Sequence, residues 1–446
     1  MLVKPELNTN ELPELLATFL DISGEQPWKR RLRWIEQQLR RNPLLLQYMQ
    51  ANHSLEQALP TLRHKVKTLG YAVTIDQGQE YRLAALIAGI VSIYERLPAK
   101  ARKRLRGSLM DGLTDPEKKG LINLQHEITV AMHLMDQGFD VTFADWEGGG
   151  RFDFLASREG AVMEVECKVV TGDLGRKITI LQSVEIFDRI VKEISRNRKP
   201  TQATILQIVL PGRLERNEQI KRRIAEIGYR AIRSGENFEE PGFGSAVVQH
   251  FDHNREQCGI KQGEPFDVPE VRDFFIRKTG IDNPHLFIAN PLNHPPLFIS
   301  VRSQQKDSVL ESIIDTLSEA AKSQLTKTRP GVFCVQLHDL TEDQLLELAQ
   351  DDSTDPRLAT GIKLATHHFL AADARSHVLS VVYRSHGKVL QRQLPDGIDA
   401  TGTRETGIAY GIPNGQHPQY GNPAFRIFTK QTPEDWTDTP LQVIRD

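Results

Sequence analysis

Apolar residues near the N-terminus recur at helical spacing. Four of them fall on one helical face, at intervals of three or four positions: Trp28, Leu32, Ile35 and Leu39. Pro43 follows and is expected to end that helix. A second apolar pattern covers 81–97, and a short basic block, 99–107, comes after Pro98. We therefore expect a helical N-terminal module over residues 1–112.

The pattern changes after Leu121, where helices and strands begin to alternate. An amphipathic helix is expected to end at Gly138, and 139–143 then alternates apolar and polar residues with the period of a strand. The next expected elements are two strands, a helix and a buried strand: 151–157, 161–170, 181–197 and 203–210. This α-β-β-β-α-β order predicts an α/β core with a mixed sheet over 113–235.

The remainder of the chain is expected to fall into three parts. Glycine and proline punctuate 236–284, which we interpret as a connector. Strand and helix patterns in 285–395 predict a second α/β domain whose role the pattern does not indicate, with a hairpin of 378–384 and 388–394 at its end. The segment 396–446 is rich in Gly, Pro and Thr and is expected to be extended.

Composition places the chain among ordinary globular proteins. Its 446 residues are 39% hydrophobic and 26% charged, which excludes collagen-like and low-complexity classes. Lys and Arg number 56 against 58 Asp and Glu, so the overall charge does not indicate a nucleic-acid-binding protein, although local basic faces could still bind one. The three cysteines are too scattered for a disulfide framework, and no apolar run reaches the roughly 20 residues of a membrane span. We expect a soluble, reduced, cytoplasmic protein.

The predicted strand 161–170 carries charge where strand centres normally avoid it. Its side chains alternate between an apolar set that includes Cys167 and a polar set of Glu164, Glu166 and Lys168. Neighbours in the polar set lie about 7 Å apart along one face of the strand. The strand therefore presents two carboxylates and an amine in a row.

Two further carboxylates are expected to approach this strand. Asp153 lies on the preceding strand, and a short hairpin would bring it beside Glu166, since cross-strand neighbours are about 5 Å apart. Glu127 lies at the edge of the apolar stripe of the helix that ends at Gly138, facing the sheet. Three or four carboxylates and Lys168 are thus predicted to converge.

Convergent carboxylates repel one another and raise their own pKa values unless a cation compensates them. Mg²⁺ takes hard oxygen ligands and is commonly held by one or two carboxylates together with substrate phosphate. Its bound water can attack a phosphodiester, and a lysine beside it can orient that water or stabilise developing charge. These residue types suit metal-dependent phosphodiester hydrolysis.

In these residues the sequence resembles the PD-(D/E)xK, or restriction-endonuclease-like, nuclease superfamily over roughly a fifth of its length, 119–212. The resemblance implies that Asp153 and Glu166 bind Mg²⁺ or Mn²⁺, that Lys168 acts on the attacking water, and that Glu127 is an accessory carboxylate at a second metal position. The proline of the family motif is absent, because Arg151 and Phe152 precede Asp153.

Two alternatives stay open at this point. Glu164, Glu166 and Lys168 could form a solvated strand face with cross-strand ion pairs, as antiparallel sheets often do. A nuclease-like core could also be a non-catalytic scaffold or partner-binding subunit, since fold does not determine function.

Basic residues are candidates for phosphate contacts. Arg176 and Lys177 follow the motif strand, and Lys192 lies on the next predicted helix. The block 99–107 and the arginine-rich face of Lys29–Arg41 are further candidates for nucleic-acid contact, although any solvated helix face carries similar charge.

The sequence as a whole predicts a Mg²⁺- or Mn²⁺-dependent nuclease, with DNA preferred over RNA as its partner. A role in bacterial defence or nucleic-acid processing would suit a nuclease joined to other domains. The resemblance is also consistent with a homodimer, because one active site per chain cuts one strand of a duplex.

Overall fold

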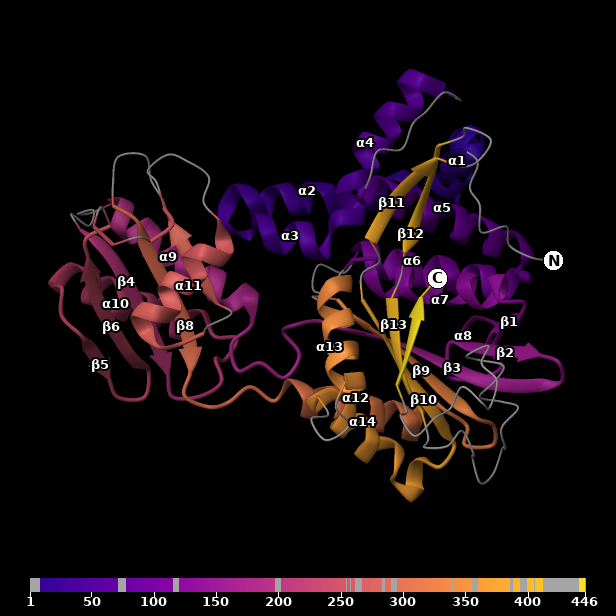
Figure 1. Cartoon of the computed structure of the whole chain (residues 1–446). Coiled ribbons are helices and arrows are strands. Elements are labelled where there is room, and N and C mark those ends of the chain that lie inside the picture. Colours follow the sequence, from indigo (N-terminus) through magenta and orange to yellow (C-terminus); the bar gives the residue numbers. More distant parts are fainter. Residues whose placement is uncertain are drawn as a thin grey trace. The chain divides into compact units, whose positions relative to one another are not determined.

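The computed structural model describes residues 9–70, 78–114, 120–196, 202–253, 255–256, 258–260, 267–282, 285–289, 295–338, 340–354, 360–385, 388–393, 399–404, 406–411 and 441–445. It is a mixed α/β protein with a helical N-terminal region and two mixed β-sheets (Figure 1). No helix in these ranges is long and apolar enough to cross a membrane.

The chain divides into two compact units. Unit 1 comprises Met1–Gln37, Met49–Leu174 and Leu310–Asp446, and unit 2 comprises Gln38–Tyr48 and Gly175–Val309. Most of unit 2 is therefore an insertion into unit 1. The two ends of this insertion meet, because the Ser308 N–H donates to the Gly175 carbonyl at 3.0 Å.

The N-terminal region is helical, as predicted. Its helices are α1 (Leu12–Ser23), α2 (Glu25–Arg41), α3 (Leu46–Asn52), α4 (Ser54–Leu69), α5 (Gln79–Arg96), α6 (Ala99–Thr114) and α7 (Ile122–Asp136), with short 3₁₀ turns at Thr9–Glu11 and Pro43–Leu45. Helix α2 ends just before Pro43, and Trp28 and Ile35 of its apolar face are buried, as the spacing indicates.

The sheet of unit 1 has seven strands in the order β1-β2-β3-β9-β10-β13-β14. Their bounds are Asp140–Phe143, Phe154–Arg158, Ala161–Val170, Gly331–Leu337, Val378–Arg384, Thr406–Gly411 and Leu441–Arg445. Strands β1, β2 and β3 are antiparallel neighbours, whereas β9 runs parallel to both β3 and β10. A short helix, α8 (Ala144–Glu147), follows β1.

The two faces of this sheet are covered by different helices. Val165 and Cys167 of β3 belong to one buried cluster with Ile128 of α7 and other residues of the N-terminal helices. The opposite face packs against α14 (Gly361–Leu370). The rings of Phe333 on β9 and Phe369 on α14 meet there, 6.0 Å apart. The same part of the chain also holds α12 (Val309–Ser323), α13 (Glu342–Thr354) and a 3₁₀ turn at Asp373–Arg375.

Unit 2 has a five-stranded sheet in the order β5-β6-β4-β8-β7. The strands are Phe238–Glu240, Gly244–Phe251, Ala203–Leu210, Leu297–Ser303 and Leu286–Ala289, and the helices are α9 (Ile180–Arg196), α10 (Glu218–Ser234) and α11 (Val268–Thr279). Helices α9 and α10 pack on one face, and α11 packs on the other through Phe274 and Phe275.

The fourth strand of the motif sheet is the main difference from the sequence prediction. The segment 203–210 was expected to complete that sheet, but it forms β4, which pairs with β6 and β8 in unit 2. The strand beside β3 is β9, from the C-terminal part of the chain. Both segments are short and apolar, so local sequence does not determine which of them pairs with β3.

The predicted division of the chain also differs from the observed one. The range 113–235 contains parts of both units, and the expected connector 236–284 holds β5, β6 and α11. The range 285–395 contributes β7 and β8 to the second sheet and β9 and β10 to the first, so it is not a separate domain. In the range 396–446, β12, β13 and β14 are described, and 412–440 lies outside the described residues.

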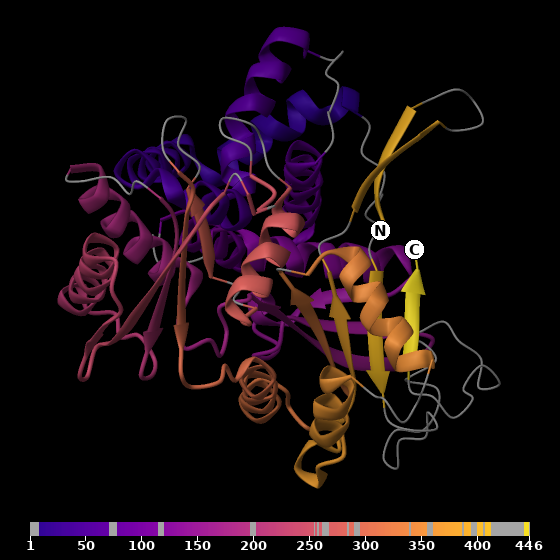
Figure 2. The ribbon, with the colours of Figure 1, turned by 60° about the vertical axis from the view of Figure 1, so that its left-hand side comes forward.

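The predicted terminal hairpin is wrong in its pairing. Strand β10 pairs with β9 and β13, while β11 (Lys388–Gln393) pairs with β12 (Asp399–Arg404) as a separate two-stranded ribbon. Figures 1 and 2 show this ribbon extending away from the seven-stranded sheet.

Candidate active site

A two-residue turn positions the first carboxylate. Glu159 and Gly160 both have positive φ, 54° and 82°, which is the conformation that joins two antiparallel strands most tightly. This turn determines the β2–β3 register, in which Phe154 pairs with Val165. Asp153 therefore lies just beyond the last pair, and its Oδ2 accepts the Cys167 N–H at 2.6 Å.

The second carboxylate and the lysine come from β3 itself. Glu166 is only 1% exposed, and its Oε1 lies 2.5 Å from the Lys168 Nζ. The Lys168 side chain is 23% exposed, so the amine lies where the buried carboxylate meets solvent. The other Glu166 oxygen, Oε2, is buried and has no hydrogen-bond partner among the described residues.

Helix α7 brings Glu127 to the same place. The preceding residue, His126, is buried, and its Nε2 lies 2.9 Å from the Cys334 carbonyl of β9, which fixes the helix on the sheet. Glu127 lies close enough to Asp153 and Glu166 for their charges to raise its pKa. All four residues predicted from the sequence are thus brought together.

Burial dominates the electrostatics of this carboxylate cluster, which we define as Glu127, Asp153 and Glu166. Desolvation raises the pKa of Asp153 to about 6 and that of Glu166 to about 8. The pKa of Glu127 is raised well above its usual value, first by burial and then by repulsion from the other two carboxylates. The Lys168 ammonium opposes these shifts but does not cancel them. The positive charge of Lys168 alone therefore does not compensate the three carboxylates.

The donor set suits a hard divalent cation held by few protein ligands. No three His, Cys, Asp or Glu side chains in the described part of the chain are placed to hold a metal together. The resemblance implies Glu127 as an accessory carboxylate at a second metal position, and that role stays a prediction. Asp153 and the bare Oε2 of Glu166 remain, and one or two carboxylates with waters and substrate phosphate are the usual Mg²⁺ environment.

Glu164 has a different role from Glu166, although both point to the polar side of β3. It is fully buried and accepts hydrogen bonds from the Thr326 N–H, at 2.8 Å, and from the Thr326 hydroxyl. Arg329 lies 3.5 Å from it. Glu164 therefore anchors the loop that leads into β9. Because Glu164 and Glu166 are both buried, this side of β3 is not a solvated strand face.

The basic residues predicted as phosphate contacts lie in unit 2, not in the unit that holds the carboxylates. The Arg176 guanidinium pairs with Asp307 at 3.1 Å, and the Lys177 backbone N–H donates to the same carboxylate. Lys192 pairs with Asp188 at 2.6 Å. These three residues and the carboxylate cluster therefore belong to different units.

Two residues near the site were not singled out from the sequence. His126 carried no signal beyond its place next to Glu127. Arg104 lies in the predicted basic block, and its Nη1 donates to the Asp145 and Trp146 carbonyls at 2.5 and 3.2 Å. It thereby joins α6 to α8, the short helix that precedes Asp153.

Comparison with known proteins adds no relative. No protein-family model matches the chain, and neither a curated protein nor a solved structure matches it. The functional interpretation therefore depends on the geometry and chemistry of the carboxylate cluster.

Proposed function

We propose that this protein is a Mg²⁺- or Mn²⁺-dependent nuclease that hydrolyses phosphodiester bonds of DNA. One observation carries the proposal: the buried carboxylate of Glu166 lies beside the half-buried carboxylate of Asp153 and beside Lys168, and one Glu166 oxygen is left bare. Burying such acids is costly without compensating charge, and a divalent cation compensates them.

The topology around the cluster supports the resemblance to restriction-endonuclease-like nucleases. Helix α7 and strands β1, β2 and β3 are followed, after unit 2, by α12 and by β9, which pairs with β3. The α-β-β-β-α-β order expected of that superfamily is therefore restored once the insertion is set aside. This resemblance stays part of the proposal.

Each residue has a defined place in the proposed chemistry. Asp153 and Glu166 would hold the cation, which supplies an activated water and neutralises charge on the scissile phosphate. Asp153 is held ready by the Cys167 N–H, and Glu166 by the Lys168 ammonium. Lys168, at the solvent boundary, would orient the water or stabilise charge on the phosphate. Glu127, close enough to Asp153 and Glu166 for their charges to act on it, would be the accessory carboxylate at a second metal position that the resemblance implies.

A cleavage assay tests the proposal. Wild type and Lys168→Ala would be incubated with plasmid DNA, single-stranded DNA and structured RNA, in Mg²⁺, in Mn²⁺ and in EDTA. We expect metal-dependent cutting of DNA by the wild type alone. Absence of cutting together with absence of Mn²⁺ binding in a parallel titration would overturn the proposal and favour a non-catalytic scaffold.

A further inference from the structure

Helix α6 presents an exposed basic face. Five basic residues precede its single acid, Asp111, and its other side is buried through Ala101, Leu105 and Leu109. Four of the basic residues have exposed side chains and define what we call the α6 basic face: Lys100, Lys103, Arg104 and Arg106.

The charge of this face is not neutralised by carboxylates. Within the described ranges, none of its four residues forms an ion pair with Asp or Glu, and Arg104 donates only to backbone carbonyls. Like charges three or four positions apart destabilise a helix by roughly 0.2–0.5 kcal/mol per pair. Lys100 and Arg104 are such a pair. Their repulsion destabilises the helix, so these residues are not there to stabilise it.

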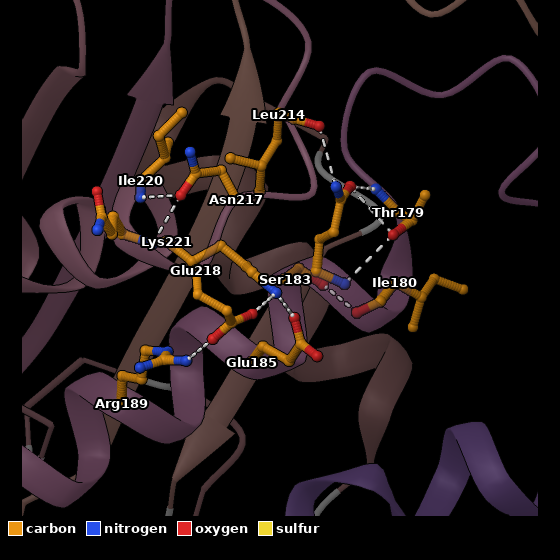
Figure 3. A network of polar contacts seen from close by, with 12 residues as sticks. Thr179, Ile180, Ser183, Glu185, Arg189, Leu214, Asn217, Glu218, Ile220 and Lys221 are labelled. Atoms are coloured by element: carbon orange, nitrogen blue, oxygen red, sulfur yellow. Dashed lines mark hydrogen bonds and ion pairs between the residues drawn. The ribbon is translucent and has the colours of Figure 1, made fainter. Parts of the chain in front are cut away.

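Two basic residues of α10 in unit 2 are, in contrast, paired with carboxylates. Figure 3 shows Lys221 of unit 2 bonded to both Glu185 and Glu218, and Glu218 also meets Arg189. Arg223 likewise lies 2.7 Å from both Glu226 and Glu240. The charges of these cations are neutralised by neighbouring carboxylates, whereas those of the α6 basic face are left available to an anion.

A glycine lies at the C-terminal end of this face. Gly107 is exposed, one turn after Lys103, and a Cβ placed on it would meet nothing within 4 Å. Glycine inside a helix costs about 1 kcal/mol relative to alanine, and here neither packing nor a positive φ requires it. Its effect is to let another backbone approach the helix closely, next to the charged side chains.

The α6 basic face adjoins the carboxylate cluster within unit 1. Arg104 holds the carbonyls of Asp145 and Trp146 in α8, and the chain then runs through Gly148 and the exposed Arg151 to Asp153. Asp145 is also near enough to Asp153 to affect its pKa. A strand of nucleic acid on α6 would therefore lie next to the proposed catalytic residues.

We propose that the α6 basic face, extended by Arg151, binds the phosphate backbone of double-stranded DNA and holds it beside the carboxylate cluster. This inference rests on the proposed nuclease function and assigns its substrate-binding surface. Lysine and arginine bind phosphates mainly through charge, so the contact positions the duplex without reading its sequence.

Binding in EDTA tests this inference separately from catalysis. The anisotropy of a labelled DNA duplex would be measured over a range of salt concentrations with wild type and with Lys100→Ala/Lys103→Ala/Arg106→Ala. The control is Lys67→Ala/Lys322→Ala, which removes exposed lysines from α4 and α12. We expect the triple variant to bind at least about tenfold more weakly, with a salt dependence smaller by roughly one unit of slope per lost phosphate contact, and the control to match wild type.

A second variant separates binding from folding. Gly107→Gln adds a side chain to the open position, so we expect a higher melting temperature but several-fold weaker DNA binding. A purely structural role for the face could not produce that combination. Unchanged affinity and salt dependence in the triple variant, or no binding of duplex DNA by wild type, would overturn the inference. Wild-type binding that depends on α6, without metal-dependent cutting, would instead refute only the nuclease proposal.

Discussion

The Asp153 carboxylate accepts the backbone N–H of Cys167 at 2.6 Å. This bond places an acidic side chain where the next N–H···O bond of the β2–β3 ladder would otherwise form. Asp153 therefore ends the paired part of the β2–β3 hairpin and lies beside Glu166. Structure and proposed chemistry depend on the same carboxylate, and conservative substitutions can separate them.

Substitution of Asp153 separates the two roles. Asp153→Asn keeps an oxygen that can accept the Cys167 N–H, whereas Asp153→Ala leaves that donor without a partner, which costs about 1–3 kcal/mol. We expect both variants to lose Mn²⁺ binding and only the alanine variant to melt at clearly lower temperature. Calorimetric titration and thermal melting measure the two effects. Retention of Mn²⁺ by Asp153→Asn would show that Asp153 is not a ligand.

Lys168 is expected to act on the reaction and not on metal retention. Removing a group that stabilises transition-state charge typically lowers the rate by about 10²–10³-fold. We expect Lys168→Ala to lose cleavage to that extent while still binding Mn²⁺. Lys322→Ala, on the exposed side of α12, is the matched control and should cleave normally. Equal loss of metal and activity in Lys168→Ala would point to a purely structural contact with Glu166.

Metal affinity is expected to rise with pH. The pKa values of Asp153, about 6, and Glu166, about 8, mean that protons must leave before both carboxylates can bind a cation. Mn²⁺ binding should therefore strengthen from pH 6 to pH 8 and release protons. Titration calorimetry in two buffers of different ionisation enthalpy measures that release. Affinity independent of pH over this range would contradict the burial-driven shifts.

The stability of the metal-free protein is expected to depend on pH in the opposite sense. The folded-state pKa of Glu166, about 8, lies above its ordinary value of 4.5, so the protonated form favours folding. Its contribution is complete below pH 4.5 and is lost as pH rises through 8. The melting temperature should therefore fall from pH 5 to pH 8. The melting temperature of Glu166→Gln should fall less over the same range. Equal slopes for the two proteins would exclude Glu166 as the cause.

Glu164 is expected to matter for folding alone. Glu164→Ala would leave the Thr326 N–H and hydroxyl without their acceptor and detach the loop before β9, at a cost of about 1–3 kcal/mol. We expect a lower melting temperature with Mn²⁺ affinity unchanged, and partial recovery of stability in Glu164→Gln. A specific loss of metal binding would place Glu164 in the site after all.

The candidate site could be predicted from sequence because its parts are local. Glu127, Asp153, Glu166 and Lys168 fall within one helix and one hairpin, and helical spacing, strand alternation and a two-residue turn bring them together. The opposite characters of Cys167 and Glu166 likewise follow from the alternation of a strand.

The rest was decided by tertiary structure. Strand β9 lies about as far from β3 in sequence as a whole domain, and its pattern resembles that of β4, so only packing determines which one pairs with β3. The burial of Glu166, which shifts its pKa, also depends on β9 from the distant C-terminal half, where Phe333 pairs with Glu166. The sequence by itself determined which side chains share a face of a helix or strand. Tertiary structure decided which sheet each strand joined and how far the carboxylates were buried from water, because both depend on contacts between segments far apart in the chain.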